Sequence, residues 1–131
     1  MKVLDASFLV DYLNGVDAAA EFLLANEAET FAVPVPAYAE VLAGEGNLPN
    51  GEIVDVVDDL SWAEIVDVDD ETAVVAGEIA AEIGSEGPYL TGMDALIAAI
   101  GRQLDAPVVT SDGDLTHPAT AAVVDVETYR D

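Results

Sequence analysis

The segment that decides the fold class is Lys2-Val3-Leu4-Asp5-Ala6-Ser7-Phe8-Leu9-Val10-Asp11-Tyr12-Leu13-Asn14. Residues 2–5 are a short apolar run that ends in a carboxylate, which predicts a buried strand. Residues 8–14 predict a helix, because Gly15 follows at the position where glycine commonly ends one. The segment is therefore the first half of a βα unit.

The rest of the chain alternates between the same two kinds of element. Further strands are predicted at residues 30–33, 63–66, 108–110 and 122–125. Further helices are predicted at residues 17–25, 36–43, 53–60, 71–83 and 91–104, the second of these closed by Gly44, and residues 112–114 are predicted to form a turn. This alternation predicts an α/β fold with a mostly parallel sheet.

The composition indicates a single folded domain covering residues 1–131. Hydrophobic residues make up 52% of the chain, which argues against an acidic disordered protein. No apolar run approaches the roughly 18 residues that span a bilayer. The N-terminal apolar stretch is too short for a signal peptide, so we expect a cytoplasmic protein without a membrane segment.

The charge is strongly one-sided, with 27 acidic residues against 3 basic ones and a formal net charge of -24. Such a charge opposes compaction by self-repulsion. At molar salt the screening length falls to about 3 Å, and this repulsion largely disappears. The near-loss of lysine over the whole surface favours the hypothesis that the protein comes from the high-salt cytoplasm of a halophile.

The residue types that are missing exclude several chemistries. The chain has no cysteine, which excludes disulfides, thiol nucleophiles and zinc–thiolate sites. It has one histidine, His117, which we interpret as a surface-loop residue. The only lysine is Lys2, which disfavours a phospho-acceptor receiver domain, and no glycine-rich phosphate loop follows the first strand.

Four carboxylates lie at the edges of apolar segments: Asp5, Glu40, Asp94 and Asp112. Asp5 and Asp112 both follow predicted strands, and the carboxyl ends of parallel strands meet at one edge of a sheet. Carboxylates gathered near a core repel one another unless something neutralises them. Oxygen-only ligands favour Mg²⁺ or Mn²⁺, so the pattern points to a metal site.

Each of these acids also has an ordinary interpretation. Asp5 could be a helix cap, and Glu40 a solvated helix position. Asp94 is the third helical residue after Thr91, as in a capping box, and Asp112 begins a common turn pair. Since acids are abundant throughout the chain, residue patterns alone leave both interpretations open.

Four segments in order carry a resemblance to a known family. They are Val3–Leu13, Pro36–Gly44, Asp94–Ala99 and Val108–Leu115. The chain resembles PIN-domain ribonucleases, and most closely VapC-type toxins of type II toxin–antitoxin systems. Leu115 stands where the family usually has an aromatic residue.

The resemblance implies a three-layer α/β/α PIN-like domain with Mg²⁺- or Mn²⁺-dependent ribonuclease activity. Asp5, Glu40, Asp94 and Asp112 would be the catalytic metal ligands, with Asp5 and Asp94 as first-choice direct ligands. Asp114 would be a weaker fifth acid. Ser7 and Thr110 would be hydroxyls that orient the carboxylates or a water.

The resemblance also implies partners: an RNA substrate, a cognate antitoxin and a second copy of the chain in a homodimer. Residues 8–24 and 53–60 are candidate partner surfaces. RNA affinity normally comes from Lys and Arg on phosphates, and this chain has three such residues. The alternatives are a PIN-domain nuclease of RNA processing without an antitoxin, and a catalytically silent PIN-like binding protein.

Overall fold

The computed structural model describes residues 1–130 and shows one five-stranded sheet with the strand order β3-β2-β1-β4-β5. Its strands are β1 (Lys2–Leu4), β2 (Phe31–Pro34), β3 (Glu64–Val66), β4 (Val108–Val109) and β5 (Val126–Glu127). All four neighbouring pairs are parallel. The predicted α/β fold is therefore confirmed, with a sheet that is parallel throughout the described chain.

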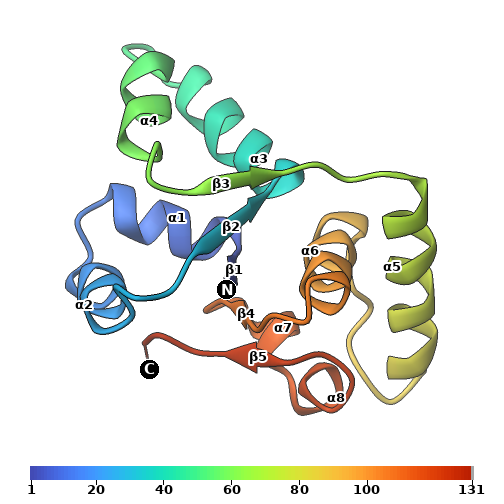
Figure 1. Ribbon diagram of the computed structural model, residues 1–131. Coiled ribbons are helices and arrows are strands. Elements are labelled where there is room, and N and C mark those ends of the chain that lie inside the picture. The colour runs from blue at the N-terminus through green and yellow to red at the C-terminus, as the bar shows by residue number, and fades with distance from the viewer. Residues whose placement is uncertain (131) are drawn as a thin grey trace.

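Helices lie on both sides of this sheet. They are α1 (Ala6–Leu13), α2 (Asp17–Ala25), α3 (Val35–Gly46), α4 (Ile53–Asp59), α5 (Asp70–Ile83), α6 (Gly92–Gln103), α7 (Gly113–Thr116) and α8 (Pro118–Ala121). Figure 1 shows α1 and α2 on one side of the sheet and α5 and α6 on the other. The three-layer arrangement is confirmed. Within residues 1–130, no helix combines the length and apolarity needed to span a membrane.

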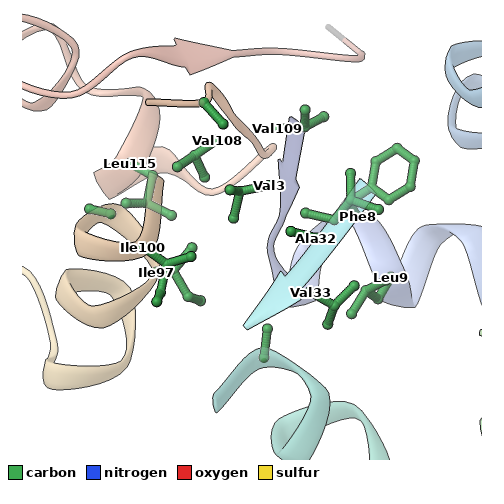
Figure 2. Close-up of a cluster of buried hydrophobic side chains, with 14 of the residues drawn as sticks. Val3, Phe8, Leu9, Ala32, Val33, Ile97, Ile100, Val108, Val109 and Leu115 are labelled. Carbon is green, nitrogen blue, oxygen red and sulfur yellow. The ribbon is translucent and has the colours of Figure 1, made fainter. Parts of the chain in front are cut away.

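The core has one half on each face of β1. Figure 2 shows Ile97 and Ile100 of α6 on one side of this strand, and Phe8 and Leu9 of α1 on the other. All four side chains are buried. Because successive residues of a strand point to opposite faces, a strand buried on both sides needs an unbroken apolar run. Val3 and Leu4 provide it, and both are fully buried.

Most predicted helix boundaries hold to within two residues, for identifiable local reasons. Gly15, with φ +74°, follows α1 in the left-handed conformation that glycine adopts without strain. Asp69 opens α5 with a capping box: its carboxylate accepts the Thr72 N–H at 2.9 Å, and the Thr72 hydroxyl accepts the Asp69 N–H at 3.4 Å.

Three sequence predictions were wrong in detail. Helix α3 continues past Gly44 to Gly46, because Gly44 does not adopt the left-handed conformation by which glycine commonly ends a helix. Residues 113–116 form the short helix α7 in place of a turn, since the Asp112 side chain caps them. The last strand is Val126–Glu127 and not residues 122–125, because α8 occupies the preceding chain and its last turn runs into that stretch.

Candidate metal centre

The carboxyl ends of β1 and β4 meet at one edge of the sheet, as the sequence predicts for Asp5 and Asp112. Leu4 is paired with Val109, and the Asp5 N–H donates to the Val109 carbonyl at 3.4 Å. A pocket opens at this edge. It is lined by Asp5, Ala6, Ser7, Val10, Asp11, Glu40, Asp94, Ile97, Ser111, Asp112 and Arg130.

Asp5 is buried at the start of α1 and uses both carboxylate oxygens. Its Oδ1 accepts the Phe8 N–H at 3.1 Å, which caps the helix, and the Ser7 hydroxyl at 2.7 Å. Its Oδ2 accepts the Thr110 hydroxyl at 2.5 Å. Burial raises the pKa of Asp5, hydrogen bonds from Thr110 and Ser7 oppose that rise, and the nearby Asp112 charge adds to it.

Two hydroxyls connect Asp5 to the loop after β4. Thr110 is fully buried, and its Oγ1 also accepts the Asp112 N–H at 2.9 Å. Ser7 Oγ accepts the Ser111 N–H at 3.0 Å. Because each hydroxyl holds the Asp5 carboxylate and one backbone amide of this loop, the pair fixes the spacing between the two strand ends.

Asp94 and Asp112 are half-buried residues at helix starts. Thr91 caps α6, and its Oγ1 accepts the Asp94 N–H at 3.1 Å. Asp112 caps α7, and its Oδ2 accepts the Asp114 and Leu115 N–H groups at 3.0 and 3.1 Å. Each carboxylate is therefore placed by a short helix-opening motif next to the sheet edge.

Asp94, Asp112 and Asp114 form a three-carboxylate group. One oxygen from each lies within 4.8 Å of the other two. Burial raises the pKa of Asp94 to about 6, and the charges of Asp112, Asp5 and Asp114 contribute to this rise. An all-oxygen donor set under mutual repulsion is the chemistry that a hard divalent cation satisfies, so these residues fit Mg²⁺ or Mn²⁺.

The structure brings most, but not all, of the predicted acids into this group. Asp5 lies outside the three-carboxylate group but lines the same pocket, and its charge acts on Asp94. Glu40 is exposed on α3 and lines the pocket as well. Asp114 belongs to the group but is exposed. The role of each acid in catalysis stays a prediction.

Asp11, Ser111 and Arg130 line the pocket but were not predicted as site residues, and neither was Tyr129, which contacts Asp11 and Ser111. Asp11 lies four residues after Ser7 on α1, and this spacing places the two side chains on one helix face. Tyr129 and Arg130 follow β5, whose carboxyl end lies at the same sheet edge as those of β1 and β4. Because the last strand was predicted at residues 122–125 and not at Val126–Glu127, the residues that follow it were not predicted to lie at this sheet edge.

Tyr129 ties the segment after β5 to α1. Its hydroxyl donates to Asp11 Oδ2 at 2.5 Å and lies 3.3 Å from Ser111 Oγ. Its ring packs edge-on against Phe8, with centroids 4.8 Å apart. Burial and the Asp11 hydrogen bond raise the pKa of Tyr129 to about 12, so the phenol keeps its proton.

The raised pKa of Asp94 predicts a stability difference that depends on pH. The ordinary pKa of Asp is about 3.9, and that of Asp94 in the fold is about 6. Between these values the folded state holds a proton that the unfolded state releases, so this contribution to stability falls as pH rises through the window. In EDTA, Asp94→Asn should therefore melt higher than wild type above pH 6, and the difference should vanish below about pH 4.

Thermal melts across pH measure this difference. Asp58→Asn, which removes one charge from the exposed face of α4, controls for relief of general repulsion. Saturating Mn²⁺ should reverse the order of wild type and Asp94→Asn at pH 7.5, because a ligand of the folded state stabilises it. Equal melting of wild type and Asp94→Asn at all pH values in EDTA would contradict the assignment.

Comparison with known proteins identifies the family to which this fold belongs. A sequence model of the PIN domain matches residues 2–121. The chain belongs to the PIN domain family, whose members are generally nucleases. No curated protein sequence matches the chain.

Solved structures share the fold over nearly the full chain. VapBC2 from Rickettsia felis bound to a promoter DNA fragment matches with a TM-score of 0.80 and 23% identity over 97% of both chains. FitAcB from Neisseria gonorrhoeae matches with a TM-score of 0.80 and 22% identity over 98% of both chains. VapC20 from Mycobacterium tuberculosis, a Sarcin-Ricin loop cleaving toxin, matches with a TM-score of 0.67 and 18% identity. The match covers 95% of this chain and 96% of the VapC20 chain.

Proposed function

We propose that the protein is a Mg²⁺- or Mn²⁺-dependent ribonuclease that acts as the toxin of a toxin–antitoxin pair. The observation that carries this proposal is the three-carboxylate group at the sheet edge of a PIN domain, with buried Asp5 beside it. Structural neighbours include VapC20, described as a toxin that cleaves the Sarcin-Ricin loop, which supports RNA as the substrate.

In this proposal Asp94 holds the metal directly, as expected from sequence. Asp112 joins it in place of Asp5, because Asp5 lies outside the three-carboxylate group and faces the metal from the end of β1. Glu40 and Asp114 complete the site from its exposed side. Asp94 must release its proton to bind a cation, so metal affinity should fall as pH drops below about 6. Ser7 and Thr110 orient Asp5 through the hydrogen bonds that they donate to its two oxygens.

When bound, a divalent cation can lower the pKa of a water and neutralise charge on the phosphate. The residues of this chain supply the frame for that chemistry. The hydrogen bonds to Asp5 and Asp112 fix the orientations of the two carboxylates before RNA arrives. Pre-set orientation is a large part of what a catalytic site contributes, because disordered ligands would have to be ordered during the reaction.

An antitoxin and a second copy are the proposed protein partners. Structural neighbours were solved as VapBC and toxin–antitoxin complexes, which supports an antitoxin. The sequence suggested two partner surfaces, residues 8–24 and residues 53–60. In the first of these, residues 8–9 are buried in the core and cannot contact a partner. On α4, Ile53, Val54 and Val57 are exposed, and apolar side chains of this kind suit a protein interface. We also propose a cytoplasmic location, where such an RNA target is found.

A ribonuclease assay tests the proposed activity. We expect the purified protein to cleave single-stranded RNA with Mn²⁺, to lose activity in excess EDTA, and to regain it when Mn²⁺ is restored. Restoration separates metal loss from irreversible unfolding, and an EDTA-treated sample should keep its circular dichroism spectrum. Cleavage that persists in EDTA would overturn the metal-dependent mechanism, and no cleavage under any condition would favour a silent binding protein.

The charge of -24 predicts a second, independent property. Because screening removes self-repulsion, the melting temperature should rise steadily from low to molar KCl. A thermal melting series in KCl at fixed pH measures this. Stability that is flat or falling with salt would contradict the proposed origin in a high-salt cytoplasm.

A further inference from the structure

The three basic side chains of this chain differ sharply in their surroundings. Lys2 forms an ion pair with Glu127 at 2.5 Å. Arg102 donates from both terminal nitrogens to Glu82, at 2.8 and 3.0 Å, and to the Val123 carbonyl at 2.7 Å. Both cations are therefore committed to contacts within the fold, away from the pocket.

Arg130 is the one basic residue among those that line the carboxylate pocket. Its Nη1 lies 2.9 Å from Asp11 Oδ2, and its side chain is 43% exposed. Within residues 1–130 no hydrogen bond of the Arg130 guanidinium meets ordinary geometry, in contrast to the three of Arg102. A guanidinium carries five N–H donors, so most of the donor capacity of Arg130 faces solvent at the pocket.

The position of Arg130 is supported independently of its own ion pair. Tyr129 packs on Phe8 and donates a hydrogen bond to Asp11. The Asp11 carboxylate also forms the ion pair with Arg130. The ring packing and the hydrogen bond of Tyr129 therefore hold the segment without the Arg130 guanidinium. Arg130 thus adds a cation to a pocket whose other charged lining residues are all acids.

We propose that Arg130 contacts a phosphate of the RNA backbone as the strand enters the carboxylate pocket. This inference rests on the proposed ribonuclease function. The planar fork of Arg is suited to bidentate contact with phosphate oxygens, and the ion pair with Asp11 keeps the Arg130 guanidinium at the pocket. Arg130 thereby places the RNA strand against the acids, in a chain that otherwise repels it.

Binding and kinetics of three variants test this role. Arg130→Gln removes the charge, Arg130→Lys keeps the charge without the fork, and Arg102→Gln removes an equal charge away from the pocket. Binding of a fluorescein-labelled single-stranded RNA is measured in EDTA across a KCl series, and kcat and KM are measured with Mn²⁺. Melting temperatures confirm that each variant is folded.

We expect Arg130→Gln to weaken RNA binding and raise KM by about tenfold, the effect of one charge-assisted hydrogen-bonding contact. The slope of log affinity against log salt should become shallower by about 0.7, as for one lost contact to a single strand. Arg130→Lys should keep the slope, and Arg102→Gln should match wild type in affinity and KM.

If wild type cleaves RNA but Arg130→Gln matches Arg102→Gln in affinity, slope and KM, this inference fails while the ribonuclease function stands. If wild type neither binds nor cleaves RNA, the proposed function fails and the role of Arg130 fails with it. A fall in kcat with unchanged binding would also overturn the proposal, since a strand-placing contact acts through affinity.

Discussion

Asp94→Asn should reduce kcat for RNA cleavage by about 10³-fold, since a metal site supplies several kcal/mol of charge stabilisation and each tenfold in rate is about 1.4 kcal/mol. Asn keeps the size of Asp but loses the negative charge. The carboxylate of Asp94 is central to the site, because it lies in the three-carboxylate group and its pKa responds to all three neighbouring acids. Steady-state kinetics with Mn²⁺ measure this effect.

Two comparisons make the Asp94→Asn result specific. Asp58→Asn removes the same charge at an exposed residue of α4 that does not line the pocket, and it should leave kcat unchanged. Asp94→Asn should also be at least as stable as wild type in EDTA, so lost activity cannot be attributed to unfolding. Activity within a few-fold of wild type would show that Asp94 is a helix-start residue without a catalytic role.

Thr110→Val should lower activity by about 10- to 100-fold, the usual effect of removing a group that orients a metal ligand. Val has nearly the shape of Thr but no hydroxyl. The change removes the donor to Asp5 Oδ2 and the acceptor of the Asp112 N–H at once. Since Thr110 is fully buried, the unpaired groups should also lower the free energy of unfolding by about 1–3 kcal/mol.

Thr110→Ser separates orientation from stability. It keeps the hydroxyl and loses one buried methyl group, which costs about 1 kcal/mol. We expect nearly wild-type kcat at a lowered melting temperature. If Thr110→Val and Thr110→Ser were equally active, the hydroxyl would have no part in placing Asp5, and its contribution would be stability alone.

The parts of the fold and site that could be predicted from sequence are those set by local patterns. The run Val3-Leu4-Asp5 has to be a buried strand that ends in a polar residue, and Val108-Val109-Thr110 repeats that arrangement. Parallel pairing then brings Asp5 and Asp112 to one edge, although 107 positions separate them. The helix caps at Asp69 and Thr91 also depend on local sequence, because each side chain accepts the N–H of the residue three positions later.

The parts that sequence could not supply depend on tertiary context. Val123 and Val124 have strand-like side chains, but α8 and the Arg102 contact to the Val123 carbonyl hold them outside the sheet. A two-residue edge strand such as β5 is fixed by its pairing with β4 and carries little signal of its own. The placement of Arg130 at the pocket, with Tyr129 on Asp11 beside it, therefore became visible only in three dimensions.

Glu40 illustrates the limit of a motif. Its segment resembles the family, yet the side chain is exposed and lies outside the three-carboxylate group. A motif fixes the residue type and helix, whereas the reach of a long side chain from α3 depends on what it meets in the pocket. Direct contact between Glu40 and a metal stays a prediction.

Anomalous scattering from crystals soaked in Mn²⁺ near pH 7.5 tests the metal site most directly. We expect a peak among the carboxylates of Asp94, Asp112 and Asp5, lost in Asp94→Asn crystals and retained in Asp58→Asn crystals. Because the surface is rich in acids, weak peaks elsewhere carry no weight. Strong Mn²⁺ peaks only at other surface acids, with none in this pocket, would contradict the assignment of the metal site to these carboxylates.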